Sequence, residues 1–516
     1  MGTISRRKEA TLDDKLDELE AQWPLWSWLR TRLKGAGLTP SSAWAVRPQE
    51  SRSSWLLMAQ PSEALIRHFE LAPEVLVLVS PWDEIQAHNF QSVAEVFRRQ
   101  IRVDPGFALV ITHDAGAERR LASVLPADRR FVFVTDEELQ RAPDPQAFLR
   151  ARLREGLGAR RLFDHRRPAT GAQFFGRERE LESLERDVNS GHSLGLFGLR
   201  KVGKTSLLRR LAEKFRNVSQ QRVFPVLVDL LALPYEQRNF AGVLTLICSR
   251  MEETLYPAGV DTASLPSDPQ KRIGTFLRWS AEYETRILLV LDEYEVLVGG
   301  RVSISDGLAV LDWLRGLVQM QGDVLSLILA GRNSRLLSPA RVQGVDNPMY
   351  RFLRTFRVAG LDPEECRSMV RKLGTRMGLD FKFDALERMV ELTGGHPALV
   401  HTLGDLIDRQ VPITARNPAT IDSSSVEEVL PCFAHEVDED MRELVEASND
   451  LDPRAAELLR HRAFGVEWIG GQAEAQIVDA LVGYGILRGD TGDIRMAQFS
   501  TWLRENYQPP ARSAHG

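Results

Sequence analysis

Cysteine is scarce in this sequence, and long apolar segments are missing. Three cysteines, Cys248, Cys366 and Cys432, stand among 516 residues. Their odd number and wide spacing argue against a disulfide framework and fit a reducing compartment. No apolar run approaches the roughly 18 residues that a membrane helix needs. The first residues have no secretory core, and Arg6 stands where a myristoylation signal needs Ser or Thr. We therefore expect a cytoplasmic protein that does not enter the membrane.

An excess of charge of either sign is also missing. Lys and Arg number 66 against 71 Asp and Glu, which gives a net charge of −5 and excludes a globally basic nucleic-acid coat. The hydrophobic share of 43% and the charged share of 27% are ordinary for globular proteins and exclude wholesale disorder. At about 150 residues per domain, a chain of this length is expected to form three or four domains.

The pattern along the chain predicts four domains. An α/β domain over 1–165 ends in a basic helix, and a second α/β domain covers 166–340. A helical domain covers 341–420, and 421–516 reads as three helices followed by a hairpin, which is typical of a winged helix. The clearest linker signal is the turn-rich segment 166–171.

Continuous apolar runs between polar helices predict a buried parallel sheet in both α/β domains. The expected strands are Val75–Val79, Phe107–Ile111 and Phe131–Val134 in the first domain, and Leu194–Phe197, Phe224–Asp229, Ile287–Leu291 and Val324–Ala330 in the second. Other expected features are a helix over Leu12–Leu33, a helix begun near Asp384 and stopped at Gly394 and Gly395, a hairpin turn over Gly489–Asp493, and a final helix with Trp502.

The most specific motif is a phosphate-binding loop at Gly198–Thr205. Its residues Gly-Leu-Arg-Lys-Val-Gly-Lys-Thr fit G-x-x-x-x-G-K-[ST], between an expected strand and an expected helix. The glycines let backbone N–H groups surround phosphate oxygens, and the helix N-terminus adds partial positive charge. Lys204 is predicted to reach the β- and γ-phosphates, and Thr205 to ligate Mg²⁺. The predicted nucleotide-binding residues here are Gly198, Val202, Gly203, Lys204, Thr205 and Ser206.

A pair of acidic residues suited to nucleotide hydrolysis ends the strand Ile287–Leu291. We expect Asp292 to hold Mg²⁺ and Glu293 to act as general base on the attacking water. An additional strand, Phe224–Asp229, lies between the two motifs. This order predicts a P-loop NTPase of the group that uses a catalytic glutamate, rather than a kinase or a GTPase.

Further segments resemble a known family. Phe175–Leu184, about twenty residues ahead of the P-loop, resembles the GRE-x-E box of STAND signalling ATPases and archaeal replication initiators. Asn347–Arg351, Phe356–Leu361 and Thr393–Pro397 resemble the archaeal-type ATPase branch of the STAND proteins. The resemblance covers about residues 172–410. It implies an α/β fold of the AAA+/ASCE type, in which a P-loop core with a parallel sheet is followed by a helical lid and a winged helix. A separate small α/β domain precedes that core.

The resemblance also implies roles for individual residues. Gly176 and Arg177, in the GRE-x-E box, are expected to contact the adenine. Pro397 is expected to pack on the nucleotide, and His396 either does so too or caps a helix end. The family places a phosphate-sensing residue after the strand Val324–Ala330, where Arg332 is the first candidate. The second candidate is Arg335, and a surface position remains open for either arginine.

The charge of the predicted winged helix argues against DNA binding. Residues 421–507 contain 18 Asp and Glu against 7 Arg and no Lys, and the expected recognition helix, Ala473–Val482, has no basic residue. Duplex binding relies on cations that neutralise phosphates, so this segment repels DNA. We interpret it as a packing or switch module, as in the STAND proteins that it resembles. Residues 141–167 have the opposite balance, with 8 Arg against 3 acidic residues, and indicate a solvated or interdomain face, which could dock on the acidic winged helix.

The N-terminal domain leaves two interpretations open. Its acidic and polar residues follow strands, where parallel sheets bind ligands but where helix caps also lie. These residues are Asp83, Glu84, His113, Asp114, Asp136, Glu137 and Glu138. Three tryptophans, Trp23, Trp26 and Trp28, indicate helix packing rather than base stacking.

Together the motifs and the resemblance predict an ATP-dependent molecular switch of the STAND type. Glu293, Lys204 and Arg332 are the predicted catalytic residues, and Thr205 and Asp292 the predicted Mg²⁺ ligands. Slow ATP hydrolysis would reset signalling or assembly, and a place in bacterial defence rests on the resemblance alone. Two alternatives stay open: a nucleic-acid-associated motor or loader ATPase, and an N-terminal effector enzyme triggered by the ATPase. The expected partners are ATP or ADP and a protein partner or further copies of the chain, rather than nucleic acid or a membrane.

Overall fold

The structure is a computed structural model of the chain, which divides into two compact units. It describes residues 11–46, 54–85, 90, 93, 96, 102–121, 125, 130–163, 174–216, 222–260, 265–299, 301–332, 340–342, 345–416, 418–468 and 472–510. Unit 1 comprises Met1–Asp164, Val370–Leu386 and Gly404–Glu427, and unit 2 comprises His165–Met369, Glu387–Leu403 and Glu428–Gly516. Both units draw residues from the predicted lid, and the division into four domains stays a prediction. No helix in the described ranges combines the length and the apolar character that crossing a bilayer requires.

Unit 2 is built on a parallel five-stranded sheet. The strands are β6 (Leu194–Gly198), β7 (Val223–Asp229), β8 (Arg286–Asp292), β9 (Leu325–Gly331) and β12 (Arg354–Val358), in the order β12-β6-β9-β8-β7. The four predicted strands of this domain are confirmed, and the P-loop strand β6 lies inside the sheet. The edge strand β12 was not predicted, because its side chains are mostly exposed and its sequence lacks an apolar run.

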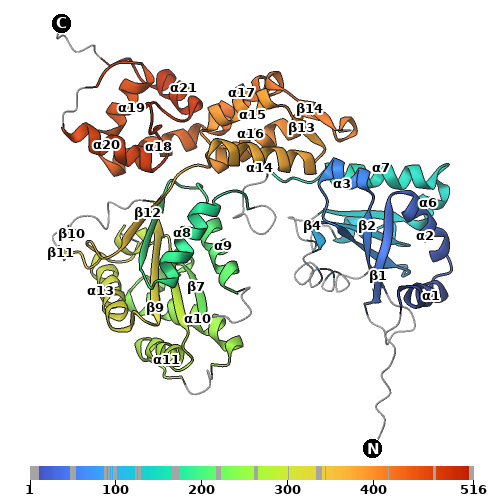
Figure 1. Cartoon of the computed structure of the whole chain (residues 1–516), viewed down its shortest axis with the longest axis horizontal. Coiled ribbons are helices and arrows are strands. Elements are labelled where there is room, and N and C mark those ends of the chain that lie inside the picture. The colour runs from blue at the N-terminus through green and yellow to red at the C-terminus, as the bar shows by residue number, and fades with distance from the viewer. Residues whose placement is uncertain are drawn as a thin grey trace, which may run out of the picture. The chain divides into compact units, whose positions relative to one another are not determined.

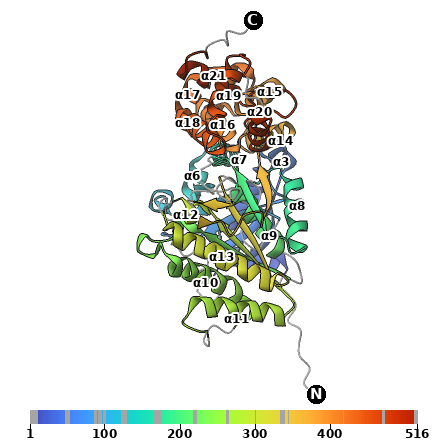
Figure 2. The ribbon, with the colours of Figure 1, turned by 90° about the vertical axis from the view of Figure 1, so that its left-hand side faces the viewer.

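Helices cover both faces of this sheet, as Figures 1 and 2 show. On one face lie α8 (Glu178–Asn189) and α9 (Lys204–Arg216), and on the other α10 (Phe240–Leu255), α11 (Pro269–Glu282) and α13 (Ile304–Gln321). The P-loop helix α9 buries apolar residues at helical spacing: Leu207, Leu208, Leu211, Ala212 and Phe215. Short elements complete this part: α12 (Glu295–Val298), η2 (Leu230–Ala232), η3 (Tyr235–Gln237), η4 (Tyr256–Ala258), β10 (Arg341–Val342) and β11 (Val345–Asp346).

The remaining helices follow β12 in the sequence. Four of them contain residues of both units: α14 (Pro363–Arg376), α15 (Phe383–Thr393), α16 (Pro397–Gln410) and α17 (Ser423–Glu436). The others belong to unit 2: α18 (Asp438–Leu451), α19 (Ala455–Ala463), α20 (Gln472–Gly483) and α21 (Ala497–Asn506). The helix stop at Gly394 and Gly395 is confirmed, since α15 ends at Thr393. Between α20 and α21 a single antiparallel bridge joins Leu487 to Ile494, so the winged helix stays a prediction.

Unit 1 contains a mixed five-stranded sheet in the order β1-β2-β3-β4-β5. Its strands are β1 (Leu38–Ala45), β2 (Trp55–Pro61), β3 (Glu74–Ser80), β4 (Val103–Thr112) and β5 (Arg130–Thr135). The three predicted parallel strands are confirmed as β3, β4 and β5. The antiparallel strands β1 and β2 were missed, because β1 is polar and contains Pro40 at an irregular register. A pair of short parallel strands, β13 (Leu379–Phe381) and β14 (Ala419–Ile421), also belongs to this unit.

Tryptophan-bearing helices cover one face of that sheet (Figure 1). The single helix predicted over Leu12–Leu33 was wrong: α1 (Leu12–Gln22) and α2 (Trp26–Gly35) are separated at Pro24, which cannot donate a helical hydrogen bond. Trp23 and Trp26 are buried in the core against β3, β4 and β5, as expected of packing residues. The other helices of the unit are α3 (Glu63–Phe69), α5 (Ala117–Leu121), α6 (Asp136–Arg141), α7 (Pro145–Gly158) and η6 (Ile413–Ala415).

The predicted basic helix is α7, and it is anchored within unit 1. Leu149, Leu153 and Leu157 join the core of the sheet. In the turn that follows, the buried Arg160 donates hydrogen bonds of 3.1 Å to the Leu157 carbonyl and 3.2 Å to the Phe69 carbonyl. The end of this basic segment therefore packs on its own unit. The predicted linker at 166–171 lies outside the described residues.

The three cysteines, all within the described ranges, are free thiols. Cys248 and Cys366 are buried, and burial raises the pKa of each to about 12. Cys432, on α17, is exposed. This arrangement agrees with the expectation that the chain has no disulfide framework.

Candidate functional site

The P-loop runs from the end of β6 to the start of α9 and surrounds a buried lysine. Lys204 is 6% exposed, and its Nζ donates to the carbonyls of Gly198, at 3.0 Å, and Leu199, at 2.9 Å. Burial lowers the pKa of this ammonium, while the carboxylates of Glu293 and Asp292 act in the opposite direction. A cation held against the loop from inside is placed to meet a polyphosphate.

The other residues predicted in the P-loop contribute a backbone conformation, core packing or a place in the first turn of α9. Gly203 has φ +102°, in the left-handed region that glycine adopts without strain. Val202 is fully buried and fixes the loop to the core. Ser206 follows Thr205 in the first turn of α9, at the helix end where backbone N–H groups lack helical partners. The predicted strand–loop–helix context is thus present.

Thr205 and Asp292 bring the two sequence motifs together. The Thr205 Oγ1 donates a 2.7 Å hydrogen bond to Oδ2 of Asp292, at the end of β8. Burial raises the pKa of the Asp292 carboxyl, whereas the hydrogen bond from Thr205 favours its ionised form. A hydroxyl and a carboxylate are the hard oxygen donors that Mg²⁺ takes from proteins, together with water and substrate phosphates. The pair therefore fits the predicted metal. No cluster of three His, Cys, Asp or Glu ligands occurs in the part of the chain that the structure describes.

Glu293 follows Asp292 in an unusual backbone conformation. Its φ is +57°, which is uncommon for a residue with a side chain and recurs at functional sites. The backbone N–H of Glu293 donates a 3.0 Å hydrogen bond to Oδ1 of Asp292, which orients the Asp292 carboxylate. Glu293 is partly exposed and so has access to water. This position fits the predicted general base.

Glu295 links the end of β8 to the end of β9. Its carboxylate accepts the backbone N–H of Arg332, immediately after β9. A Cβ at the neighbouring Gly331 would lie 2.4 Å from the Glu295 oxygens, so the contact is close. The backbone that carries the sensor candidate Arg332 is thereby held beside the strand that ends in Asp292. The alternative candidate Arg335 lies outside the described residues.

Arg177 has a structural connection that the sequence did not indicate. It is buried, and its Nη2 donates to the carbonyls of Val202 and Ala359, both at 2.8 Å. Its backbone N–H donates to Oε1 of Glu365 at 2.6 Å, beside Gly176. Burial lowers the pKa of the Arg177 guanidinium. This arginine joins the P-loop to the chain that leaves β12, and its contact with adenine stays a prediction.

The start of α16 reaches the P-loop through His396. The buried ring has its Nε2 3.1 Å from the Arg200 carbonyl, and burial lowers its pKa to about 4. The neutral ring therefore donates from Nε2, which leaves Nδ1 as an acceptor. This buried Nδ1 has no hydrogen-bond partner within the described ranges. An unsatisfied acceptor beside the P-loop fits a bound nucleotide, and Pro397, the first residue of α16, lies next to it.

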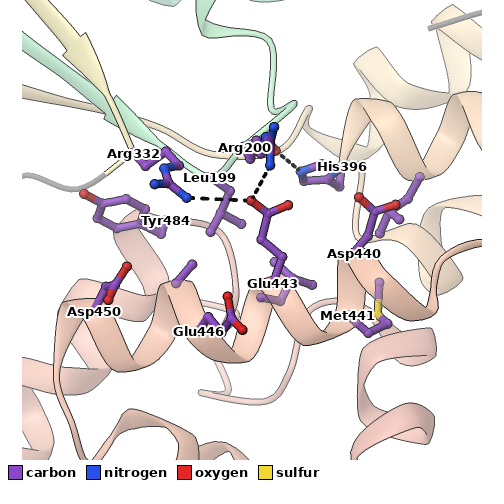
Figure 3. Close-up of a pocket in the computed structure, with 13 residues that line it drawn as sticks. Leu199, Arg200, Arg332, His396, Asp440, Met441, Glu443, Glu446, Asp450 and Tyr484 are labelled. Carbon is purple, nitrogen blue, oxygen red and sulfur yellow. Dashed lines mark hydrogen bonds and ion pairs between the residues drawn. The ribbon is translucent and has the colours of Figure 1, made fainter. Parts of the chain in front are cut away.

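Three cations around the P-loop are paired with one helix, α18. Arg200 Nη1 lies 3.2 Å from Oε1 of Glu443, and Arg332 Nη1 lies 3.8 Å from the same oxygen. Lys201 Nζ lies 2.9 Å from Oδ1 of Asp440. Figure 3 shows Arg200, Arg332, Asp440 and Glu443 around a pocket. It is lined by Leu199, Arg200, Arg332, His396, Leu399, Asp440, Met441, Glu443, Leu444, Glu446, Ala447, Asp450 and Tyr484.

The family comparison agrees with this geometry. The model of the family Novel STAND NTPase 1 matches residues 163–430, just over half of the chain. The chain belongs to this family. It is therefore a P-loop NTPase of the STAND class, and the predicted family, α/β P-loop fold and enzyme class are confirmed.

Several solved structures are similar to this STAND NTPase. The Walker-type ATPase PABY2304 of Pyrococcus abyssi has a TM-score of 0.47 and 20% identity, over 66% of this chain and 99% of that one. The Aeropyrum pernix ORC2 protein in its ADP form has a TM-score of 0.39 and 16% identity, over 67% and 88%. The Aeropyrum pernix ORC1 protein in complex with DNA has a TM-score of 0.35 and 16% identity, over 64% and 93%. No curated protein shows significant similarity to the chain.

The acidic residues in the N-terminal part of this STAND NTPase make local contacts. Asp114 accepts backbone N–H groups of Ile85 and Gly116, both at 3.0 Å, and pairs with Arg120. The hydrogen bond from Arg120 is the main cause that lowers the pKa of Asp114. The other strand-end residues behave similarly: Thr135 and Glu138 form a capping box at α6, and His113 pairs with Asp136. The contacts of Glu138 favour the helix-cap interpretation at α6, whereas the His113–Asp136 pair does not decide between a cap and a ligand site.

Proposed function

We propose that this STAND NTPase is an ATP-dependent molecular switch, which binds and slowly hydrolyses ATP·Mg²⁺ to control signalling or assembly. The observation that carries the proposal is the set of ion pairs between α18 and the cations Arg200, Lys201 and Arg332. Because these pairs connect the C-terminal helices to the phosphate-binding loop, a change at the phosphates affects a segment outside the P-loop core. The resemblance to STAND sensors supports a place in bacterial defence or regulation.

The binding roles follow from the contacts of each residue. The backbone N–H groups from Gly198 to Thr205 receive the phosphates, and Lys204 supplies the cation at the centre of the loop. Gly176, Arg177 and Pro397 are the proposed contacts on the adenine side. Thr205 and Asp292 hold Mg²⁺, which, when bound, neutralises charge on the phosphate oxygens.

The proposed catalytic residues are Glu293, Lys204 and Arg332. Glu293 accepts the proton of the attacking water as general base. Lys204 and Arg332 stabilise negative charge on the γ-phosphate. Slow turnover is consistent with the pairing of Arg332 to Glu443, because an arginine engaged elsewhere is not available to the phosphate.

The C-terminal contacts favour a switch over a nucleic-acid motor. We propose that 421–516 is a winged helix, with α20 as its expected recognition helix. The acidic residues of α20 face partners within the protein: Asp479 lies 3.4 Å from Arg357 of β12, and Glu474 lies 3.3 Å from Arg462. Both acidic residues of α20 pair with arginines of the same chain, and α20 has no basic residue. This helix is therefore poorly suited to bind the phosphate backbone of a nucleic acid.

Two substitutions test the site assignment. Lys204→Ala is expected to abolish ATP binding, and Glu293→Gln to retain binding while losing turnover, with calorimetry and phosphate release as the measurements. Lys214→Ala is the matched control, because Lys214 lies on the same helix and pairs with Glu185 at the surface. Tight ATP binding by the Lys204→Ala protein would overturn the assignment.

A second measurement separates the switch from the motor. The switch predicts an ATP-dependent change in assembly state, visible in light scattering after size exclusion, and no effect of DNA or RNA on turnover. ATPase activity stimulated several-fold by nucleic acid, without a change in assembly, would instead support the motor.

A further inference from the structure

One carboxylate of α18 faces two guanidinium groups at the phosphate end of the site. Oε1 of Glu443 lies 3.2 Å from Arg200 and 3.8 Å from Arg332, as the dashed lines in Figure 3 indicate. Three residues earlier on the same helix, Asp440 pairs with Lys201 at 2.9 Å. The i, i+3 spacing places both acids on one face of α18, towards the loop.

The three cations belong to the parts of the site that meet phosphate. Arg200 and Lys201 are inside the P-loop sequence, and Arg332 follows the strand that ends beside the catalytic acids. A terminal phosphate would present oxygens of the same charge as these carboxylates, and guanidinium groups bind both. Glu443 and Asp440 thus hold cations that a third phosphate group would otherwise recruit.

We propose that Glu443 and Asp440 set how strongly the site discriminates a nucleoside triphosphate from a diphosphate. The proposal rests on the nucleotide binding proposed above and deepens it. With α18 in place, the γ-phosphate must compete with the two carboxylates for Arg200, Lys201 and Arg332. A diphosphate, which ends at the β-phosphate held by Lys204 and the loop amides, meets no such competition.

The ion pairs between α18 and the three cations are exposed to water, so a γ-phosphate can displace the carboxylates reversibly. The side chains of Arg200, Lys201 and Arg332 are 63%, 45% and 45% exposed, and those of Glu443 and Asp440 about a quarter. Ion pairs that remain in contact with water are individually weak. A triphosphate can therefore open them, and the site then releases this face of α18.

The test compares two nucleotides in the full-length protein. Kd values for a slowly hydrolysed ATP analogue and for ADP, both with Mg²⁺, are measured for wild type and for Glu443→Gln, Asp440→Asn and the double variant. Each single variant is expected to raise the preference for the triphosphate about fivefold, and the double variant further. The control is Glu439→Gln, which removes an equal charge from the exposed side of α18 and is expected to leave the preference unchanged.

The outcomes separate this inference from the proposed function. If the wild-type chain binds neither nucleotide, the proposed function fails. The inference is overturned if wild type binds both nucleotides and the variants Glu443→Gln and Asp440→Asn leave the triphosphate preference unchanged. An equal increase in affinity for both nucleotides has the same meaning. Because Asp440→Asn breaks a different pair from Glu443→Gln, folding failure of one variant leaves the other to decide.

Discussion

The hydroxyl of Thr205 donates a 2.7 Å hydrogen bond to the carboxylate of Asp292, across 87 residues of sequence. This contact brings the start of the P-loop helix to the end of β8, next to Glu293. We propose that the side-chain oxygen atoms of both residues bind one Mg²⁺ ion.

Loss of the Thr205 hydroxyl or of the Asp292 carboxylate is expected to remove the Mg²⁺ dependence of nucleotide binding. Thr205→Val keeps the side-chain shape but deletes the hydroxyl, and we expect at least a tenfold loss of affinity in Mg²⁺ with little change in EDTA. Nucleotide titrations in the two buffers measure this. Thr205→Ser should restore the dependence, and Thr245→Val, which removes an exposed hydroxyl bonded to Ala241 on α10, should have no effect. If the nucleotide affinity in Mg²⁺, divided by that in EDTA, is the same for Thr205→Val as for wild type, the metal assignment is contradicted.

Replacing the buried Arg177 is expected to destabilise unit 2 and weaken nucleotide binding together. Arg177→Met keeps much of the apolar stem but leaves the Val202 and Ala359 carbonyls without their donor. A buried acceptor at Val202 and a partly buried one at Ala359, both left unpaired, cost about 3 kcal/mol in the free energy of unfolding. Denaturant unfolding measures this cost, and the exposed neighbour Arg179→Met serves as control. Equal stability of the two variants would show that the buried hydrogen bonds contribute little.

Gly395 offers a matched pair of glycine substitutions. Gly395 has φ +72°, and a Cβ there would lie 2.2 Å from the Leu361 carbonyl, whereas Gly465, at φ +65°, has nothing within 4 Å of its Cβ position. Both alanine variants carry the backbone cost of about 1 kcal/mol, and only Gly395→Ala adds the collision. We therefore expect a clearly lower melting temperature for Gly395→Ala than for Gly465→Ala. Similar melting temperatures would mean that this segment shifts without cost.

The buried His396 is expected to make stability depend on pH between 6.5 and about 4. Above pH 6.5 the ring is neutral in the folded and the unfolded chain. As the pH falls towards 4, the unfolded chain takes up a proton that the folded chain excludes, so stability decreases, by up to about 3 kcal/mol. His396→Gln, whose amide can still donate to the Arg200 carbonyl, should flatten unfolding free energy over this window. Identical pH profiles for the two proteins would contradict a buried neutral ring.

Local patterns account for what the sequence predicted. The P-loop and the pair Asp292–Glu293 were recognisable because phosphate and metal binding require particular residues at short spacing. The central strands β8 and β9 were found because strands buried on both faces are continuously apolar. The acidic balance of the C-terminal segment predicted a packing or switch module, but the only partner that the sequence suggested was the basic segment 141–167, not the P-loop cations that pair with α18.

Long-range contacts account for what was missed. The partners of Arg177 lie 25, 182 and 188 residues away, and two of them are backbone carbonyls, which leave no signature in the sequence. The edge strand β12 was overlooked because an exposed strand alternates or loses its apolar residues. The pairs of Asp440 and Glu443 with the P-loop were likewise outside the reach of local pattern, since ordinary surface helices also have rows of acids.

The distribution of the three thiols has a practical consequence. Cys248 and Cys366 are buried and resist deprotonation near neutral pH, whereas Cys432 is exposed on the helix that precedes α18. Because the thiolate is the reacting form, a maleimide dye should attach to Cys432 in the native protein without removal of the other cysteines. Fluorescence from that dye then offers a direct optical record of whether nucleotide binding alters the surroundings of α17.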